Sequence, residues 1–268
     1  PEPTLVHDPD LNAIGLTDLR DSYFERLYRL CVEQGLHEHY GQLDRQGRMH
    51  ADIMDFPNDH FYDGLLQTLA GPEPDQTHYQ HKPLDIPFSF SEAKRLLPFP
   101  LPDSAFLSLS AFRVLFIPVL SPDALPNQKI APAEAELIAR WVVYFKKQYA
   151  EKGKPWRPEH SLGIITPWRA QIAQLRQSIA AAGIDHDDIT IDTVERYQGG
   201  ARDIILISCC VHSDTQLKNL VNLSGEGVDR KLNVALTRAR ERVILFGNPE
   251  VLRADERYKD FIDQYGVE

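Results

Sequence analysis

The sequence predicts an α/β fold in which a parallel β-sheet is flanked by helices and preceded by an N-terminal helical arm. Short apolar runs alternate with amphipathic segments in the second half of the chain, and such alternation is typical of right-handed βαβ crossovers. One run, Ile204 to Cys210, is apolar at every position except Ser208, as expected of a strand that is covered on both faces of its sheet. With 43% hydrophobic and 25% charged residues, the 268-residue chain can bury a substantial core.

Five apolar or β-prone runs predict the strands, at residues 112–117, 162–165, 189–192, 204–210 and 243–246. Two helices are expected to start near Pro132 and Pro167, because proline is tolerated in the first turn of a helix. Gly183 is expected to end the second of them, since glycine readily adopts the left-handed conformation found at helix ends. An apolar stripe over residues 232–239 predicts a third helix.

The first part of the chain follows a different pattern. Leu19 and Tyr23 begin an apolar series at helical spacing, whereas residues 71–103 contain seven prolines. Because proline removes a backbone N–H, this stretch is expected to be irregular, either a functional loop or a hinge. We therefore expect two parts: an N-terminal helical arm over residues 1–103, packed on a sheet domain over residues 104–268.

Charge and hydropathy narrow the function classes. Acidic residues (39) outnumber basic residues (29), and the net charge of -10 argues against a broadly basic surface that binds nucleic acid without specificity. Any nucleic-acid contact must then come from a local patch. The chain has neither an apolar run long enough to span a membrane nor a secretory leader, so we expect a cytoplasmic protein with no membrane partner.

The cysteines and histidines do not predict a disulfide framework or a metal site. Cys31, Cys209 and Cys210 are too few for a disulfide scaffold and are expected to be reduced, buried thiols. His78 and His81 have the H-x-x-H spacing of some zinc sites, but they lie in the proline-rich stretch without a nearby cysteine. No metal ligand is therefore assigned in this chain.

Ligands of parallel sheets bind beyond the carboxyl ends of the strands, and three polar segments are expected at such positions. The first, Thr166 to Gln171, follows a predicted strand and starts a helix, where free N–H groups suit a phosphate. The same residues also fit an ordinary helix start. In the second segment, Gly199 and Gly200 permit a ligand to approach the backbone closely, but paired glycines also make a plain turn.

The third segment carries two arginines near the end of the predicted third helix. Arg238 and Arg240 are expected on opposite flanks of its apolar stripe, at the edge of the packed face. A guanidinium group is planar, permanently charged and able to donate two parallel hydrogen bonds, which suits phosphate oxygens. The alternative for either arginine is a solvated, salt-bridged helix flank.

Together the three segments resemble motifs IV, V and VI of superfamily 1 helicases, most closely those of the up-frameshift and senataxin-type group. They are Gly163 to Gln171, Asp192 to Ser208 and Leu232 to Arg240, and the last, LNVALTRAR, is nearly identical to the family motif. An upstream element, Gln46 to His50, resembles the QYRMH signature of the same group. The resemblance covers about residues 20–250.

The resemblance implies a RecA-like, P-loop NTPase-type three-layer sandwich, the C-terminal of two RecA-like motor domains. In this family ATP and Mg²⁺ bind to a phosphate loop and an acidic pair on the first RecA-like domain, and neither motif occurs in this sequence. The chain, which starts at Pro1 rather than Met, is therefore expected to be part of an ATP-dependent helicase. Its partner would be the first RecA-like domain, and the fragment alone is expected to be inactive.

The resemblance also implies which residues meet the nucleotide. Arg48 and Arg238 align with the family's arginines that reach the γ-phosphate of ATP, and they are expected to be catalytic. Gln198 and Gly199 align with the motif V loop that borders the nucleotide. These four residues form the expected cofactor-binding set.

Thr166, Pro167 and Thr193 align with residues that contact the backbone of single-stranded DNA or RNA, and we favour DNA. Two departures from the family pattern bear on the nucleotide. Gly47 replaces a tyrosine that can stack on the base of ATP, and Ala201 replaces a glutamate that contacts the ribose. These departures motivate an alternative, a catalytically idle RecA-like scaffold or nucleic-acid-binding module.

Overall fold

The structure, a computed structural model, forms two compact units, Pro1–Asp44 and Arg45–Glu268. The described residues are 5–18, 22–69, 83–86, 95–96, 112–120, 126–197, 200–221 and 229–267. His78, His81, Gln198 and Gly199 lie outside these ranges. No helix within them is apolar enough, over a sufficient length, to cross a membrane.

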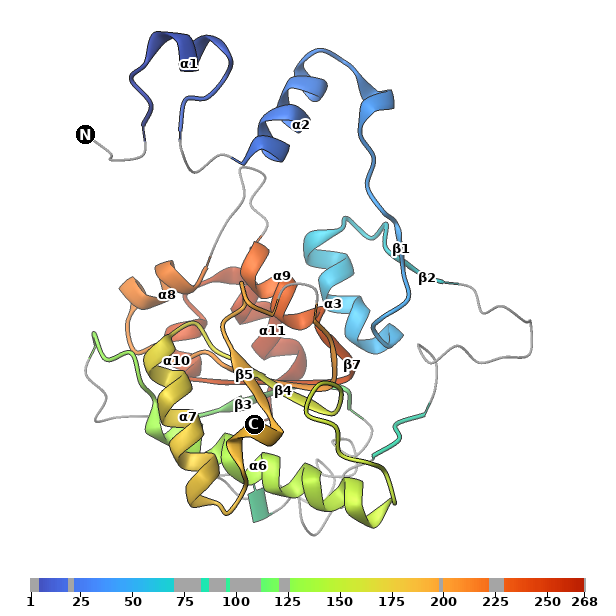
Figure 1. The fold of residues 1–268 in the computed structure, drawn as a ribbon, viewed down its shortest axis with the longest axis vertical. Helices are drawn as coiled ribbons and strands as arrows, with labels where there is room; N and C mark the ends of the chain where they lie inside the picture. The colour runs from blue at the N-terminus through green and yellow to red at the C-terminus, as the bar shows by residue number, and fades with distance from the viewer. Residues whose placement is uncertain are drawn as a thin grey trace. The chain divides into compact units, whose positions relative to one another are not determined.

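The larger unit is built on a five-stranded sheet with the strand order β3-β7-β6-β4-β5, in which every neighbouring pair is parallel (Figure 1). The strands are β3 (Val114–Pro118), β4 (Leu162–Ile165), β5 (Thr190–Asp192), β6 (Arg202–Ser208) and β7 (Ala239–Gly247). Each of the five predicted runs forms one of these strands. The predicted parallel sheet is therefore confirmed.

Helices cover both faces of this sheet and complete three layers (Figure 1). They are α3 (Ala51–Phe61), α6 (Pro132–Glu151), α7 (Arg169–Ala181), α8 (Asp214–Leu220), α9 (Arg230–Leu236), α10 (Pro249–Leu252) and α11 (Glu256–Tyr265). Alternate residues of β7 separate the two faces. Ile244 and Phe246 belong to a core with α6 and α7, whereas Val243 and Leu245 belong to a core with α3, α9 and α11.

The helices predicted after Pro132 and Pro167 are confirmed, but the third predicted helix was too long. α9 ends at Leu236, and Ala239 already starts β7, where it pairs with Arg202 of β6. Ala239, the last residue of the predicted apolar stripe, therefore pairs with β6 and does not extend the helix. As a result Arg238 lies in a turn and Arg240 lies on a strand, and neither is on a helix flank.

The smaller unit contains α1 (Pro9–Ala13), α2 (Tyr23–Glu33) and a short 3-10 helix, η1 (His37–His39). None of these elements contains a buried residue. The following residues belong to the larger unit, where β1 (Arg45–Gln46) pairs in parallel with β2 (Gln67–Thr68) and α3 buries Ile53 and Phe56. The predicted division at residues 103 and 104 falls outside the described residues and stays a prediction.

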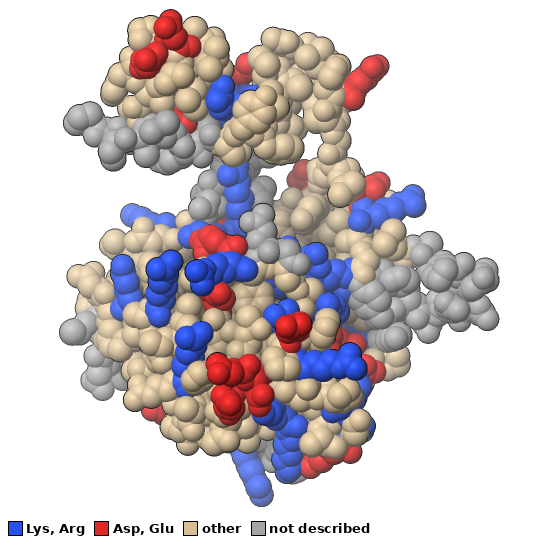
Figure 2. Space-filling model, viewed as in Figure 1, with Lys and Arg blue, Asp and Glu red and all other residues tan. Residues whose placement is uncertain are grey.

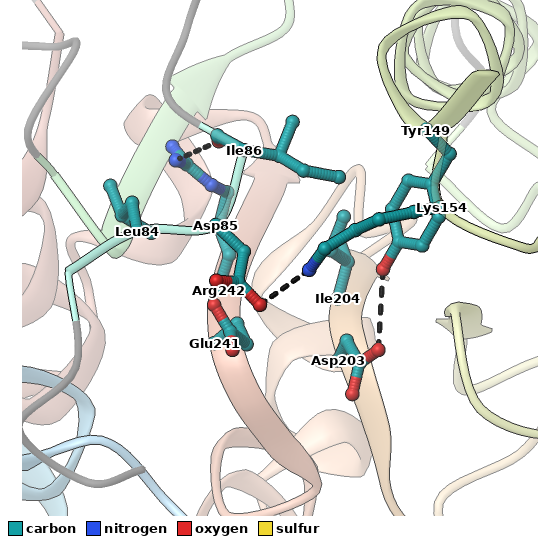
Figure 3. Close-up of a pocket in the computed structure, with 9 residues that line it drawn as sticks. All are labelled: Leu84, Asp85, Ile86, Tyr149, Lys154, Asp203, Ile204, Glu241 and Arg242. Carbon is teal, nitrogen blue, oxygen red and sulfur yellow. Dashed lines mark hydrogen bonds and ion pairs between the residues drawn. The ribbon is translucent and has the colours of Figure 1, made fainter. Parts of the chain in front are cut away.

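A short piece of the proline-rich stretch, residues 83–86, lies against the sheet (Figure 3). Arg242 of β7 is almost fully buried and donates hydrogen bonds to the carbonyls of Ile86 (3.1 Å) and Phe112 (2.7 Å). Lys154 forms an ion pair with Asp85 beside it. Burial lowers the pKa of the Arg242 guanidinium to about 9, so this side chain remains charged at neutral pH.

Candidate functional site

Arg48 is held by a turn that links β1 to α3. The side-chain oxygen of Gln46 accepts hydrogen bonds from the backbone N–H groups of Arg48 (2.9 Å) and Met49 (2.8 Å). The backbone N–H of His50 donates to the carbonyl of Arg240 (3.0 Å), which joins this turn to the start of β7. The turn therefore aims Arg48 at the residues just before β7, where its Nη1 donates to the carbonyl of Thr237 (3.2 Å).

Arg238 lies in the turn between α9 and β7. Its Nε donates to the carbonyl of Val234 (3.1 Å), one turn back in the helix, and its Nη1 lies 3.4 Å from the carbonyl of Gly200. Its Nη2 lies 3.4 Å from the hydroxyl of Thr237. Thr237 thus contacts both Arg48 and Arg238, which approach it from segments 190 residues apart in the sequence.

The two guanidinium groups lie close enough to repel each other. Burial lowers the pKa of Arg238, and the positive charge of Arg48 lowers that pKa further. Among the described residues, neither arginine forms an ion pair with a carboxylate. Two like charges without a counter-charge favour a multiply charged anion between them, and the bidentate geometry of guanidinium suits phosphate oxygens. We call Arg48, Thr237 and Arg238 the arginine cluster.

The arginine cluster lies at the amino-terminal edge of the sheet. Arg238 precedes the first residue of β7, and its carbonyl accepts a hydrogen bond from the N–H of Arg202, the first residue of β6 (3.0 Å). The expectation that all three polar segments lie beyond carboxyl ends of strands is therefore wrong for this one. A helix that connects two parallel strands starts near the carboxyl end of the first strand and leads back to the amino end of the second. Arg238 follows such a helix, so it lies at the amino-terminal edge.

Thr166, Pro167 and Thr193 do lie at the carboxyl edge, directly after β4 and β5. The hydroxyl of Thr166 is fully buried and has no hydrogen-bond partner within the described ranges. Thr193 is partly exposed, and its N–H donates to the carboxylate of Asp192 (2.9 Å). The predicted nucleic-acid residues therefore adjoin one another, but on the edge opposite the arginine cluster.

An ion pair closes the carboxyl edge next to Thr166. Lys231, at the start of α9, lies 3.3 Å from the carboxylate of Glu195 in the loop after β5. Both residues line a small cavity together with Thr166 and Pro167. Helix α9 therefore begins beside the predicted nucleic-acid residues and ends beside the arginine cluster.

The loop after β5 runs toward Gly200, and Tyr197 anchors it. The hydroxyl of Tyr197 donates to the carbonyl of Thr190 (2.8 Å) and passes over Gly163. A Cβ atom at Gly163 would lie 2.0 Å from that hydroxyl oxygen, so only glycine fits beneath the tyrosine. Gln198 and Gly199 follow Tyr197 directly, and their expected contact with the nucleotide stays a prediction.

The glycine at position 47 leaves room that another side chain uses. A Cβ atom on Gly47 would lie 2.6 Å from the Cδ1 atom of Leu69, so the leucine occupies the space next to this residue. Leu69 follows β2 directly, and its N–H donates to the carbonyl of Gln46 (3.0 Å). An aliphatic side chain therefore lies beside the position where the helicase family often has an aromatic ring.

A buried polar network at the carboxyl end of β6 was not foreseen from the sequence. The hydroxyl of Ser208 donates to the carboxylate of Glu134 (2.6 Å), and that carboxylate also accepts from the N–H of Cys210 (3.0 Å). Gln171 donates to Ser208 (3.0 Å) and exchanges hydrogen bonds with the backbone of Ala131. Glu134 thus holds Cys210 in a left-handed conformation (φ 47°), which residues other than glycine seldom adopt.

Glu134 is expected to make the stability of this unit depend on pH. Burial raises the pKa of its carboxyl from 4.5 to about 7, against the opposing effect of its hydrogen bonds. The folded state therefore binds this proton more tightly than the unfolded state, which stabilises the folded state by about 3 kcal/mol at low pH. This stabilisation is present in full below pH 4.5 and is lost as the pH rises through 7. Glu134→Gln should remove this part of the pH dependence in urea unfolding measured from pH 4 to 8.

Glu136→Gln is the matched control for that measurement, because Glu136 is exposed on the same helix. The control should keep the pH profile of the parent chain. An identical pH profile for Glu134→Gln and the parent chain would show that the carboxyl of Glu134 does not titrate in this range.

Comparisons with known proteins agree with this architecture. A family model described as an AAA domain matches residues 19–250. A regulator of nonsense transcripts 1 homolog from Drosophila melanogaster is 29% identical over 256 residues, which cover 92% of this chain and 18% of that protein. The putative helicase MOV-10 of Gallus gallus is 27% identical over 226 residues, covering 80% of this chain and 21% of that protein.

A further relative is the DNA polymerase alpha-associated DNA helicase A of Saccharomyces cerevisiae. It is 28% identical over 260 residues, which cover 94% of this chain and 33% of that protein. The chain therefore spans between about a fifth and a third of the length of these curated relatives.

Proposed function

Because the chain belongs to the AAA domain family, as the second RecA-like domain of a superfamily 1 helicase of the up-frameshift type, we propose that it completes an ATP-driven motor. In the full-length protein it supplies Arg48 and Arg238 to ATP bound on the first RecA-like domain. It also contacts a single strand of DNA or RNA through Pro167 and Thr193, which are partly exposed, and through Thr166, whose buried hydroxyl must be uncovered for that contact. The observation that best supports this proposal is the approach of Arg48 and Arg238 to the same residue, Thr237.

The arginine cluster fits the terminal phosphate of ATP. ATP supplies the phosphoanhydride bond, and Arg48 and Arg238 neutralise the negative charge that develops on the transferred phosphoryl group. The described part of the cluster contains no carboxylate, so its chemistry suits phosphate oxygens and not Mg²⁺. The ligands of Mg²⁺ are therefore assigned to the first RecA-like domain.

Helix α9 gives the two ends of the site a physical connection. Lys231 at its start is paired with Glu195 beside the nucleic-acid residues, and Arg238 follows its end. A bound nucleic-acid strand that displaces the loop carrying Glu195 would shift the start of this seven-residue helix. Because a short helix moves as a rigid body, the shift would reach the arginine cluster and couple strand binding to ATP turnover.

The smaller unit supports the proposed partner domain. Tyr23 and Phe24 on α2 are 70% and 79% exposed, and Leu27 on the same helix is 42% exposed. Exposed aromatic and aliphatic side chains on one helix indicate a surface that another element covers. We assign the first RecA-like domain of the same protein as the element that covers α2.

The proposal is tested by ATP hydrolysis in the full-length protein with and without single strands. We expect turnover that a single strand stimulates, whatever its base sequence, because backbone contacts carry no sequence information. The isolated chain is expected to show negligible hydrolysis. If the full-length protein neither hydrolyses ATP nor binds nucleotide, the motor is excluded and the idle scaffold, which the substitutions at Gly47 and Ala201 suggest, is supported.

A further inference from the structure

An open groove of about 510 Å³ lies between α7 and the edge strand β5, next to the nucleic-acid residues. Its floor is apolar and consists of Ile172, Ala173 and Ile191. Three exposed arginines line it: Arg169 and Arg176 on α7, and Arg196 in the loop after β5. None of these three arginines belongs to the arginine cluster or to the residues that we propose to contact the nucleic-acid strand.

The groove carries a local positive charge in an acidic protein. Arg169 and Arg176 form no ion pair with a carboxylate in the portion of the chain that the structure describes. Arg196 has only a distant one, the carboxylate of Asp192 at 3.7 Å, and its side chain is 69% exposed. Figure 2 shows Lys and Arg side chains gathered over the part of the larger unit where α7 and α8 lie. In a chain with a net charge of -10, three arginines facing a groove that holds one carboxylate, that of Asp192, give this groove a local excess of positive charge that suits an anionic ligand.

The spacing of the arginines suits a chain of phosphates. Arg169 and Arg176 are seven residues apart, so they share one face of α7 and stand roughly 10 Å apart along its axis. A stacked nucleic-acid strand carries one phosphate about every 3.4 Å, so the two arginines span about three phosphates. Ile172 and Ala173 lie between them on the same face and can pack against sugars or bases.

The groove also continues from the carboxyl edge. Arg169 starts α7 two residues after Pro167, and Asp192, which lines the groove, precedes Thr193 directly. A nucleic-acid strand that contacts Thr193 would therefore reach the groove past Asp192, whose carboxylate accepts from the N–H of Thr193 (2.9 Å) and pairs with Arg196.

We propose that this groove is a second binding site for the same strand, in which Arg169, Arg176 and Arg196 neutralise two or three phosphates beyond Thr193. The inference rests on the proposed nucleic-acid function and adds a binding site to it. The site contributes affinity and length of contact and takes no direct part in ATP hydrolysis, because its residues lie on α7, on β5 and in the loop after β5, and none lies on α9 or in the arginine cluster.

The test uses the full-length protein with Arg169→Gln and Arg176→Gln combined. Each lost phosphate contact lowers the slope of log K against log salt by about 0.7 for a single strand, so the double variant should lose about 1.4. Shortening the strand one nucleotide at a time should weaken binding by the parent protein over two or three nucleotides at one end. The double variant should not respond to those nucleotides, and its maximal strand-stimulated turnover should match that of the parent.

Lys152→Gln with Lys259→Gln is the matched control, since both lysines are exposed and their removal changes net charge equally. The control should keep the parent slope. If the double variant also keeps that slope while the parent binds strands, the groove does not hold the strand, as when an acidic protein segment occupies it. If the parent binds no single strand at all, the proposed nucleic-acid function fails together with this site.

Discussion

Replacing Arg238 by alanine in the full-length protein is expected to slow ATP hydrolysis by about 10³- to 10⁵-fold while leaving ATP affinity nearly unchanged. This range corresponds to about 4–7 kcal/mol of transition-state stabilisation. The expected loss is large because the negative charge on the transferred phosphoryl group needs a fixed positive charge beside it. Arg238 is fixed by its hydrogen bonds to Val234 and Gly200 before any nucleotide arrives.

Single-turnover hydrolysis and nucleotide binding, measured separately, distinguish this role from a loss of binding. Arg240→Gln is the matched control. Arg240 lies two residues further along and pairs with Asp203 at 3.3 Å, so its loss should change turnover little. Turnover within tenfold of the parent in Arg238→Ala would contradict the assignment of Arg238 as an arginine finger.

The partnership of the two arginines has its own signature. If Arg48 and Arg238 act on the same phosphoryl group, the double alanine variant should be scarcely slower than the more damaged single variant. Residues that act as a unit lose most of their effect when either one is removed. A double variant whose loss equals the product of the two single losses would show that the arginines act independently.

The sheet could be predicted because burial on both faces leaves a nearly continuous apolar record in the sequence. The run from Ile204 to Cys210 could be assigned to a strand without knowing which strands lie beside it. The end of α9 could not be predicted in the same way. Ala239 fits the apolar stripe of the helix, but its pairing with Arg202 of β6 decides its structure, and that partner is 37 residues away. Tertiary contact here overrides the local pattern.

The candidate site shows a similar division. The motif letters selected Arg48 and Arg238, and the structure brings both to Thr237. The sequence motifs did not indicate which edge of the sheet carries the two arginines, because that depends on the direction in which α9 leads to β7. The motifs also did not reveal the buried Glu134, because an acidic residue in a helix is normally expected to face solvent. Its role depends on Ser208 and Cys210, more than 70 residues away.

Replacing Arg242 by alanine is expected to lower the free energy of unfolding by about 2–5 kcal/mol, because each buried carbonyl that loses its donor costs about 1–3 kcal/mol and the emptied volume adds to the loss. The substitution leaves the carbonyls of Ile86 and Phe112 without their donor and opens a cavity beneath them. Figure 3 shows the guanidinium reaching from β7 to the Ile86 carbonyl, with Lys154 and Asp85 paired beside it. Loss of this contact should also free residues 83–86 from the sheet.

Urea unfolding and amide hydrogen exchange of residues 84–86 measure the two effects independently. Arg242→Met separates their causes, because methionine keeps most of the buried volume but donates no hydrogen bond. It should lose less stability than alanine and yet free residues 83–86 to the same extent. Lys152→Ala, at an exposed position, should stay within about 0.5 kcal/mol of the parent. Unchanged exchange at residues 84–86 in both Arg242 variants would mean that the ion pair of Lys154 and Asp85 suffices to hold this segment on the sheet.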